Sequence, residues 1–365
     1  MKNTLGSSVS VTLFGESHGT AVGAVLDGMA PGVPVDEAFI ARQLELRRPY
    51  GTISTARREA DTVELVSGVF EGKTTGTPLC VLIRNTDANS ADYAATRSLA
   101  RPGHADYTAY EKYHGYEDYR GGGHFSGRLT APLVALGAIA LTALRGRGIC
   151  VGTHIARCGG VDDRGFGDLD ADLAALANKP FAALDDDCGA VMRAVITAAA
   201  EAGDSVGGIL ETAVTGVPAG VGEPWFDTLE GQLAHMLFAI PAVKGVEFGA
   251  GFAAADLHGS ECNDALYMDG GTVRARTNHN GGINGGISNG MPLLLRCAVK
   301  PTPSIRQEQE TVDFLAKQDA ALTIRGRHDP AIVHRARVVV DSAVALTLCD
   351  MLALRYGTDW LAPEK

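Results

Sequence analysis

The feature that most constrains the fold is an apolar run in the middle of the sequence, LVALGAIALTAL, from Leu133 to Leu144. The surrounding segment 128–148 is apolar on nearly every helical face, which predicts a helix buried on all sides. Gly146 or Gly148 is expected to end this helix. The run is too short to span a bilayer, so the fold has to enclose the helix within protein.

Strands and isolated helices alternate irregularly around this central helix. Residue alternation and β-branched content predict strands at 8–14, 61–70, 77–85, 149–159, 207–218 and 293–299. Helices are expected at 225–240, at 306–318, at 331–357 and at 35–48, where Asp36 is the N-cap. Because no regular strand–helix alternation occurs, the pattern favours an α+β fold over a doubly wound sheet.

The domain organisation follows from the absence of linkers and repeats. No Pro/Ser-rich tract divides the 365 residues, so one domain over 1–365 is expected. The segment 162–187 is acidic and rich in Ala, which predicts a surface insertion carrying a short helix.

Charge and cysteine content exclude several classes of function. The net charge of −11 argues against a broad nucleic-acid surface, although a local basic pocket for a small anion stays compatible with it. The seven cysteines are scattered without a CxxC pair, so neither a metal site nor a disulfide framework is indicated. The N-terminus lacks the apolar run of a signal peptide, and a cytoplasmic protein without membrane attachment is expected.

Arginines are concentrated in segments rich in Gly and Pro. They are Arg42, Arg47, Arg48, Arg57, Arg58, Arg101, Arg120, Arg128, Arg325, Arg327 and Arg335. Guanidinium groups match carboxylate and phosphate oxygens, so converging segments would form a pocket for a multiply anionic small molecule. Solvated helix ends and surface ion pairs explain the same pattern equally well.

Half of the ten histidines share a setting with these arginines. Five lie in loop-like segments with Gly or Pro nearby: His18, His104, His124, His279 and His328. The spacing of a metal site, such as HExxH, is absent. Acid–base chemistry near neutral pH therefore suits these side chains better than metal binding.

Two glycine runs and one proline-rich corner complete the set of unusual segments. The runs 120–123 and 281–290 contain neither a Walker A loop nor a GxGxxG turn, so nucleotide binding by those routes is not supported. The segment KPTPSI, 300–305, follows a predicted strand. It is either a phosphate-binding corner or a strand exit enforced by proline, and the sequence leaves both open.

Taken together, these segments resemble one family. FGESHG (14–19), RPGHADYT (101–108), YRGGG (119–123), PAVKGVEFG (241–249), NHNGGINGGIS (278–288), KPTPSI and GRHDP (326–330) occur in the order and spacing of chorismate synthases. The resemblance extends from about residue 5 to beyond 350. It implies a β–α–α–β sandwich with antiparallel sheets enclosing helices, and a homotetramer.

The resemblance also implies a reaction. Family members convert 5-enolpyruvylshikimate 3-phosphate to chorismate and phosphate by an anti 1,4-elimination in the shikimate pathway. They require reduced FMN although there is no net redox change. Either NADPH used directly or a separate flavin reductase supplies the electrons, and the sequence leaves both open.

The resemblance carries residue roles onto this chain. It implies that His18 protonates the departing phosphate, that His104 protonates the reduced flavin near N1, and that Asp329 relays a proton near N5. The residues it places at the substrate are Ser17, Arg47, Arg57, Arg128 and Arg327. Those it places at the flavin are His124, Phe125, Ser126, Pro241, Ala242, Gly285, Lys300, Pro301, Thr302, Pro303, Ser304 and, again, Arg327. Glu16 is expected to be structural, because a carboxylate would repel a trianionic substrate.

The chain departs from the family pattern at one flavin segment. Many members read RGGGRSSARET where this chain reads RGGGHFSGRLT, so His124 and Phe125 replace an Arg and a Ser. An Arg expected after RRPGTS is also missing, and Arg57 is a candidate to replace it. Two rival functions are an NADPH-dependent flavin reductase and a non-catalytic phosphometabolite-binding protein. The second predicts loss of His18 or His104, and both are present.

Overall fold

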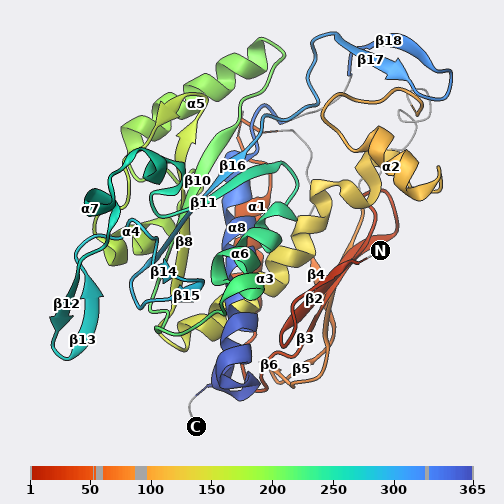
Figure 1. The fold of residues 1–365 in the computed structure, drawn as a ribbon. Coiled ribbons are helices and arrows are strands. Elements are labelled where there is room, and N and C mark those ends of the chain that lie inside the picture. The colour runs from red at the N-terminus through yellow and green to blue at the C-terminus, as the bar shows by residue number, and fades with distance from the viewer. Residues whose placement is uncertain (1, 52, 55–60, 87–96, 325–328, 364–365) are drawn as a thin grey trace.

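Two antiparallel sheets enclose a layer of helices in this protein (Figure 1). The computed structural model describes residues 2–51, 53–54, 61–86, 97–324 and 329–363. The first sheet has the order β1-β2-β3-β7-β4, formed by Thr4–Leu5, Ser10–Gly15, Ala21–Asp27, Leu79–Arg84 and Val63–Ser67. The second has the order β11-β16-β10-β8-β9, formed by Val243–Phe248, Leu293–Val299, Gly208–Thr215, Cys150–Cys158 and Val161–Asp162.

Four helices fill the space between the sheets. They are α1 (Glu37–Arg47), α3 (Thr130–Arg145), α6 (Leu229–Phe238) and α8 (Val333–Tyr356). Helix α3 packs against β3 and β7 of the first sheet, while α8 packs against β8 and β10 of the second. Helices α3 and α8 also pack against each other (Figure 1). The fold is therefore a β–α–α–β sandwich of the α+β class, which confirms the expectation from sequence.

The central apolar helix is enclosed as its composition predicts. Leu136, Ile139 and Leu144 of α3 are at most 1% exposed, and Gly146 is its C-cap. Over the described residues, the helical stretch 120–145 is long and apolar enough to cross a membrane, but 89% of its most apolar window is buried inside the protein. Its apolar faces therefore pack on neighbouring helices and strands.

The crossing of α3 and α8 depends on one small residue. A β-carbon at Gly137 would lie 2.6 Å from the Cα of Ser342, well inside van der Waals contact. The missing side chain lets the two helices approach closely at the centre of the sandwich.

The outer face of the second sheet is covered by the segment predicted as an acidic insertion and by the helix that follows it. The segment 162–187 contains the short helix α4 (Leu169–Leu176) and leads into α5 (Asp186–Glu201). Most of its residues are exposed or half-buried, but Phe181, Ala182 and Ala183 are buried. The amide of Ile155 in β8 donates to the carbonyl of Ala182 at 2.8 Å, so the end of the segment is bound to the sheet.

One predicted element is wrong, and one predicted strand is divided in two. The segment 306–318 is not a helix but carries β17 (Gln309–Asp313), which pairs with β18 (Gln318–Leu322). The Asp313 carboxylate accepts the amides of Leu315 and Ala316 and forms a turn that an isolated helical pattern does not reveal. The strand expected over 61–70 is interrupted at Gly68, where φ is +81°, between β4 and β5 (Val69–Phe70).

Smaller elements connect these layers. They are β6 (Lys73–Thr74), α2 (Asp106–Tyr113), η2 (Arg120–Phe125), η3 (Gly127–Leu129), η4 (Trp225–Asp227), η5 (Gly251–Asp256), α7 (Gly259–Cys262), β12 (Leu266–Asp269), β13 (Thr272–Ala275), β14 (Ile283–Asn284), β15 (Ile287–Ser288) and η6 (Thr358–Leu361).

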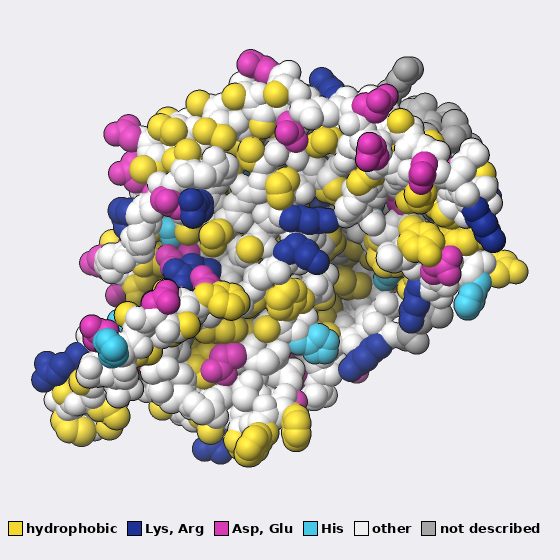
Figure 2. Space-filling model, turned by 45° about the horizontal axis from the view of Figure 1, so that its top comes forward, with side chains coloured by type: hydrophobic (Ala, Val, Ile, Leu, Met, Phe, Trp, Pro, Cys, Tyr) yellow, Lys and Arg dark blue, Asp and Glu magenta, His cyan; other side chains and the backbone are white. Residues whose placement is uncertain are grey.

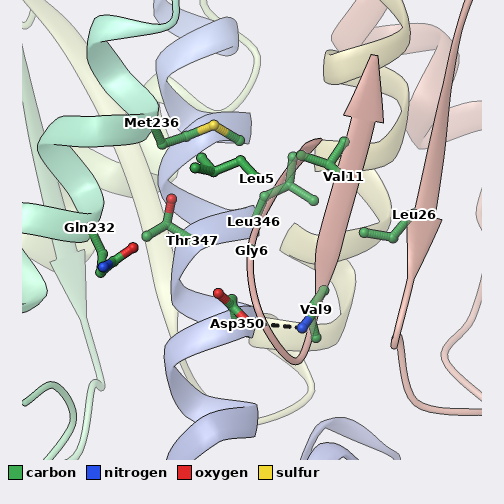
Figure 3. A pocket seen from close by; sticks show the side chains of 10 residues that line it. All are labelled: Leu5, Gly6, Val9, Val11, Leu26, Gln232, Met236, Leu346, Thr347 and Asp350. Carbon is green, nitrogen blue, oxygen red and sulfur yellow. Dashed lines mark hydrogen bonds between the residues drawn. The ribbon is translucent and has the colours of Figure 1, made fainter. Parts of the chain in front are cut away.

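The two ends of the chain are joined through Asp350 of α8. Its carboxylate accepts the backbone amides of Ser7, Ser8 and Val9 in the turn between β1 and β2, at 2.7–3.1 Å. Figure 3 shows this contact at the edge of a small, mostly apolar cavity between β2, α6 and α8. The first strands of the chain are therefore held by its last long helix.

Candidate active site

Most of the described loops with the unusual motifs lie at one end of the sandwich, and the β14–β15 hairpin lies apart from them (Figure 1). Figure 2 looks toward that end and shows a hollow with Lys, Arg and His side chains around it. Hydrogen bonds connect the motifs in two groups, one around His18 and one around His104, described in turn below.

The FGESHG turn is held by the glycine run of η2. Strand β2 ends at Gly15, where φ is +99°, and the chain then turns. The amide of Ser17 donates to the carbonyl of Gly123 at 3.0 Å. His124 Nδ1 donates to the carbonyl of Gly15 at 2.9 Å. The structure therefore joins FGESHG to YRGGGHFSGR, two segments a hundred residues apart in the chain.

His18 lies directly over Gly121 of that run. A β-carbon at position 121 would come within 2.5 Å of His18 Nε2, and Gly121 has a φ of +58°. His18 is 8% exposed, and Ser17 is fully buried. The hydroxyl of Ser17 has no hydrogen-bond partner among the described residues, and a position-121 side chain would also approach it, to 3.2 Å. The glycine run thus forms the floor on which the His18 ring and the Ser17 hydroxyl lie.

An acidic side chain stands close to His18. The guanidinium of Arg120 donates to Asp118 at 2.8 Å and lowers the pKa of that carboxyl, and the nearby imidazole of His18 lowers it further. Asp118 therefore stays charged at neutral pH and places a negative charge near the His18 ring.

Two of the predicted substrate arginines meet at a buried carboxylate. Asp61 accepts from Arg47 Nη2 at 2.8 Å and from Arg128 Nη1, and Arg48 Nε lies 3.8 Å away. Burial raises the pKa of Asp61, but the two arginines outweigh burial and keep the pKa below its usual value. Burial also lowers the pKa of Arg47, and Asp61 opposes that effect. Among the described residues, three arginines therefore meet at this one buried carboxylate.

Asn85 connects this arginine cluster to the FGESHG turn. Its side-chain oxygen accepts from Arg128 Nε at 3.1 Å. Its side-chain nitrogen donates to the carbonyls of Glu16 and Gly19, at 3.0 and 2.9 Å. The turn that carries His18 is therefore fixed relative to Arg128 by one amide side chain.

The second group brings RPGHADYT onto KPTPSI. His104 Nε2 is 2.7 Å from the hydroxyl of Ser304, which is buried. Lys300 Nζ donates to the carbonyl of Gly103 at 2.6 Å, and its amide donates to the carbonyl of Ala242 at 3.0 Å. Ala242 itself has a φ of +75°, unusual for a residue with a side chain. Three of the predicted flavin segments, those at 241–242, 300–304 and His104, are therefore neighbours.

The rest of KPTPSI faces the second sheet. Ser205 donates its hydroxyl to the carbonyl of Thr302 at 2.6 Å, and Pro303 packs on Gly103. A shallow surface hollow lies between Pro301 and the residues 205–209. The hydroxyl of Thr302 is buried without a hydrogen-bond partner among the described residues.

Asp329 lies where the last segment meets α8. It is 8% exposed and pairs with Arg335 in the first turn of that helix. The carbonyl of Pro330 accepts from the amide of Val206 at 2.8 Å, which places this corner beside the segment 205–207. The charge of Arg335 also lowers the pKa of Arg47, so Asp329 lies near the arginine cluster as well.

Some predicted residues lie elsewhere. Gly285 is exposed in the turn between β14 and β15, a hairpin that packs on Thr228 and Gly222 at a distance from α2 (Figure 1). Phe125 is 43% exposed and its ring lies 6.0 Å from that of Tyr113, while the Ser126 hydroxyl accepts from the amide of Arg128. Arg57 and Arg327 lie outside the described residues. Among the residues that are described, no group of three or more His, Cys, Asp or Glu could hold a metal ion.

Sequence reasoning missed the residues that hold the site together. Asp61, Asn85 and Asp118 were not singled out, because a lone polar residue at a strand end gives no signal of its own. One clue for Asp61 was available, since it lies close after a run of arginines that needs a compensating charge.

Comparison with known proteins agrees with this geometry. The family model described as chorismate synthase matches residues 9–353. The chain belongs to the chorismate synthase family. It is 46% identical to the chorismate synthase of Aeropyrum pernix, covering 100% of this chain and 95% of that protein. It is 47% identical to the one from Methanocella arvoryzae, covering 96% and 94%.

A solved structure extends the comparison to the fold. The chain matches a crystal structure of chorismate synthase with a TM-score of 0.76 and 28% identity, covering 97% of this chain and 94% of the other. Family membership makes this chain an enzyme of the lyase class in the shikimate pathway.

Proposed function

We propose that this enzyme converts 5-enolpyruvylshikimate 3-phosphate to chorismate and phosphate by an anti 1,4-elimination with reduced FMN. The observation that carries the proposal is the nearly buried His18, beside a buried Ser17 hydroxyl without a hydrogen-bond partner among the described residues, joined through Asn85 to the buried arginine cluster of Arg47 and Arg128. A substrate with one phosphate and two carboxylates needs such a cluster, and a departing phosphate needs a proton donor.

His18 has the surroundings of that donor. Asp118 stands close enough to interact with its charge, and Gly121 leaves room for the ring. Protonation of a phosphate oxygen lowers the negative charge on the leaving group, so phosphate departs more readily. The Ser17 hydroxyl, which has no hydrogen-bond partner in the described part of the chain, would donate a hydrogen bond to the same phosphate.

Arg47 and Arg128 hold the substrate anions in this proposal. Both are buried and fixed by Asp61, so their guanidinium groups need no reorganisation when substrate binds. Arg57 and Arg327 are proposed to add further contacts, on the strength of the family motifs alone.

The residues around His104 are suited to hold a flavin. The hydroxyl of Thr302 has no partner among the described residues, and Lys300 and His104 provide hydrogen-bond donors beside it. Bound there, reduced FMN would supply an electron transiently and take it back. His104 would hold a proton near N1 and Asp329 would carry one near N5, with Pro241 and Ala242 as further contacts. Gly285, which lies in the β14–β15 hairpin away from this group, is proposed as a flavin contact on the strength of the family motif alone.

The decisive assay supplies 5-enolpyruvylshikimate 3-phosphate and chemically reduced FMN without oxygen, and measures chorismate and phosphate. Equal amounts of both products are expected. Intact, folded protein that forms neither product with fully reduced flavin would overturn the proposal. Mixing the enzyme with NADPH and FMN in the dark then separates the two sources of electrons, since unaided bleaching means that no separate reductase is needed.

We also propose a homotetramer in the cytoplasm. Large apolar side chains lie exposed on η4 and β12: Trp225 (84%), Phe226 (94%), Leu266 (69%) and Met268 (65%). Surfaces of this kind mark contacts between subunits. Light scattering after size exclusion measures the mass directly, and a monomer at micromolar concentration would contradict this assembly.

A further inference from the structure

One buried histidine lies beside the candidate active site and has no role in the proposed reaction. His334 is in the first turn of α8 and is fully buried. Its ring stacks on Phe181, with centroids 6.2 Å apart, and meets the ring of Tyr50 edge-on at 5.4 Å. Its Nε2 lies 2.7 Å from the hydroxyl of Ser54.

The environment of His334 suits a holding role better than proton transfer. Burial and, to a smaller extent, the charge of Arg335 lower its pKa to about 4. At neutral pH the ring is therefore uncharged, and one ring nitrogen can exchange a hydrogen bond with Ser54 in either direction. A group that does not titrate near neutral pH is a poor acid–base catalyst there.

The two residues that contact His334 from the other side belong to the loop after α1. Tyr50 and Ser54 follow Arg47 and Arg48 in the sequence. Those two arginines lie at the end of α1 and face Asp61. The loop is thus bound at its start by the arginine cluster and further along by His334. Burial raises the pKa of Tyr50 to about 12, so its phenol stays neutral in this contact.

The same turn of α8 also holds the other side of the site. Arg335, the next residue, pairs with Asp329. One helical turn therefore contacts both the loop that follows the substrate arginines and the segment that carries the proposed proton relay.

We propose that His334 is a positioning residue of this site. By holding Ser54 and Tyr50 against the first turn of α8, it sets the place of Arg47 and Arg48 relative to Asp329. Its effect on turnover rests on the proposed function, whereas its effect on the loop does not.

Substitutions at the two ends of the hydrogen bond test the proposal. His334→Leu fills the space without a polar atom, while His334→Gln carries an amide to about the place of Nε2. We expect His334→Leu and Ser54→Ala each to lower kcat/KM about tenfold, mainly through a higher KM, because one buried hydrogen bond is lost. His334→Gln should stay within about threefold of the unchanged enzyme.

A double variant shows whether the two residues act through one contact. His334→Leu combined with Ser54→Ala should be no worse than His334→Leu alone. Thr347→Val removes a buried hydroxyl farther along α8 and serves as the control with unchanged KM. In the described part of the chain, this hydroxyl donates to the carbonyl of Ala343 in the same helix. Additive losses, or an unchanged KM in a folded His334→Leu enzyme, would overturn the proposal.

Hydrogen exchange measures the loop without reference to catalysis. Peptides covering 46–54 should exchange faster in His334→Leu than in the unchanged protein or in His334→Gln. Equal exchange in all three would refute the positioning role, even if activity changed. If the unchanged enzyme formed no chorismate while exchange responded as expected, the proposed function would fail and the positioning of the loop would stand.

Discussion

The ring of His18 rests on the backbone of Gly121, so near that a β-carbon there would lie 2.5 Å from Nε2. Gly121 also has a φ of +58°, which a residue with a side chain rarely adopts. Both the contact with His18 and the backbone conformation therefore exclude a side chain at this position. The glycine run is thus part of the geometry of the candidate site and not only a flexible connection.

Gly121→Ala should displace His18 and lower kcat by at least about a hundredfold, because a shifted proton donor loses its alignment. The measurement is the steady-state rate with reduced FMN. Gly122→Ala is the matched control, since Gly122 has a φ of +82° but its nearest neighbour atom would be 3.8 Å away. It should cost about 1 kcal/mol of stability and keep most activity. Similar rates in both variants would contradict the role of Gly121.

Asp61→Asn tests whether the carboxylate holds the arginine cluster. Removing it leaves Arg47 and Arg128 buried without their anion, which typically destabilises a fold by about 3–5 kcal/mol. Urea unfolding gives this difference, and binding of substrate should weaken as well. Glu64→Gln breaks the exposed pair with Arg84 and should leave the unfolding midpoint unchanged. A fully stable Asp61→Asn protein would show that the cluster does not depend on this charge.

The buried carboxyl of Asp341 makes the protein less stable as pH rises, whereas a carboxyl with a lowered pKa, such as that of Asp61, makes it more stable. Burial raises the pKa of Asp341 in α8 to about 6, so the folded state binds its proton more tightly than the unfolded chain does. The stabilisation from this group is full below about pH 4 and is lost as pH rises to about 6. The loss amounts to roughly 3 kcal/mol, because a tenfold change in proton affinity corresponds to about 1.4 kcal/mol.

Asp341→Asn should remove that slope. The amide oxygen can still accept from the hydroxyl of Thr153, so the contact to β8 is kept. Thermal unfolding at several pH values between 4 and 7 gives the comparison. If the slopes of the variant and the unchanged protein coincide, Asp341 does not titrate in this range.

Phe125→Ser restores the residue that many family members carry. The side chain is 43% exposed and touches Tyr113, so we expect a small loss of stability and full retention of chorismate formation. Steady-state kinetics and a melting curve are sufficient. Loss of folding or of turnover would show that Phe125 has acquired a role of its own in this chain.

Local patterns revealed the parts of the fold that have a strong signal of their own. The central helix, its stop at Gly146 and the N-cap at Asp36 follow from apolar content and capping chemistry, and the structure has all three. The segment 306–318 was wrongly predicted to be a helix. Its strand β17 pairs with β18 and contacts residues 98–100, and no local pattern encodes these contacts. The helix α5 was not foreseen, although its buried residues Gly189, Met192 and Ile196 recur at helical spacing.

The candidate site, like the fold, could be predicted only in part from the sequence. The histidines and arginines were visible in sequence because they gather near glycines. That His18 needs Gly121, and that Arg128 reaches the FGESHG turn through Asn85, are relationships across the tertiary structure. The layered arrangement and the residue roles came from the family motifs and not from residue patterns.

The hydrogen bonds between the Asp350 carboxylate and the amides of residues 7–9 have a consequence for folding during synthesis. Helix α8 packs on β8 and β10 and follows every strand of both sheets in the sequence, so it is synthesised after them. Until it emerges, the β1–β2 turn lacks the carboxylate that binds it. The apolar surface that α8 covers is therefore exposed in the nascent chain while the strands of both sheets are already made, and we expect a variant without α8 to lose the order of the β1–β2 turn as well.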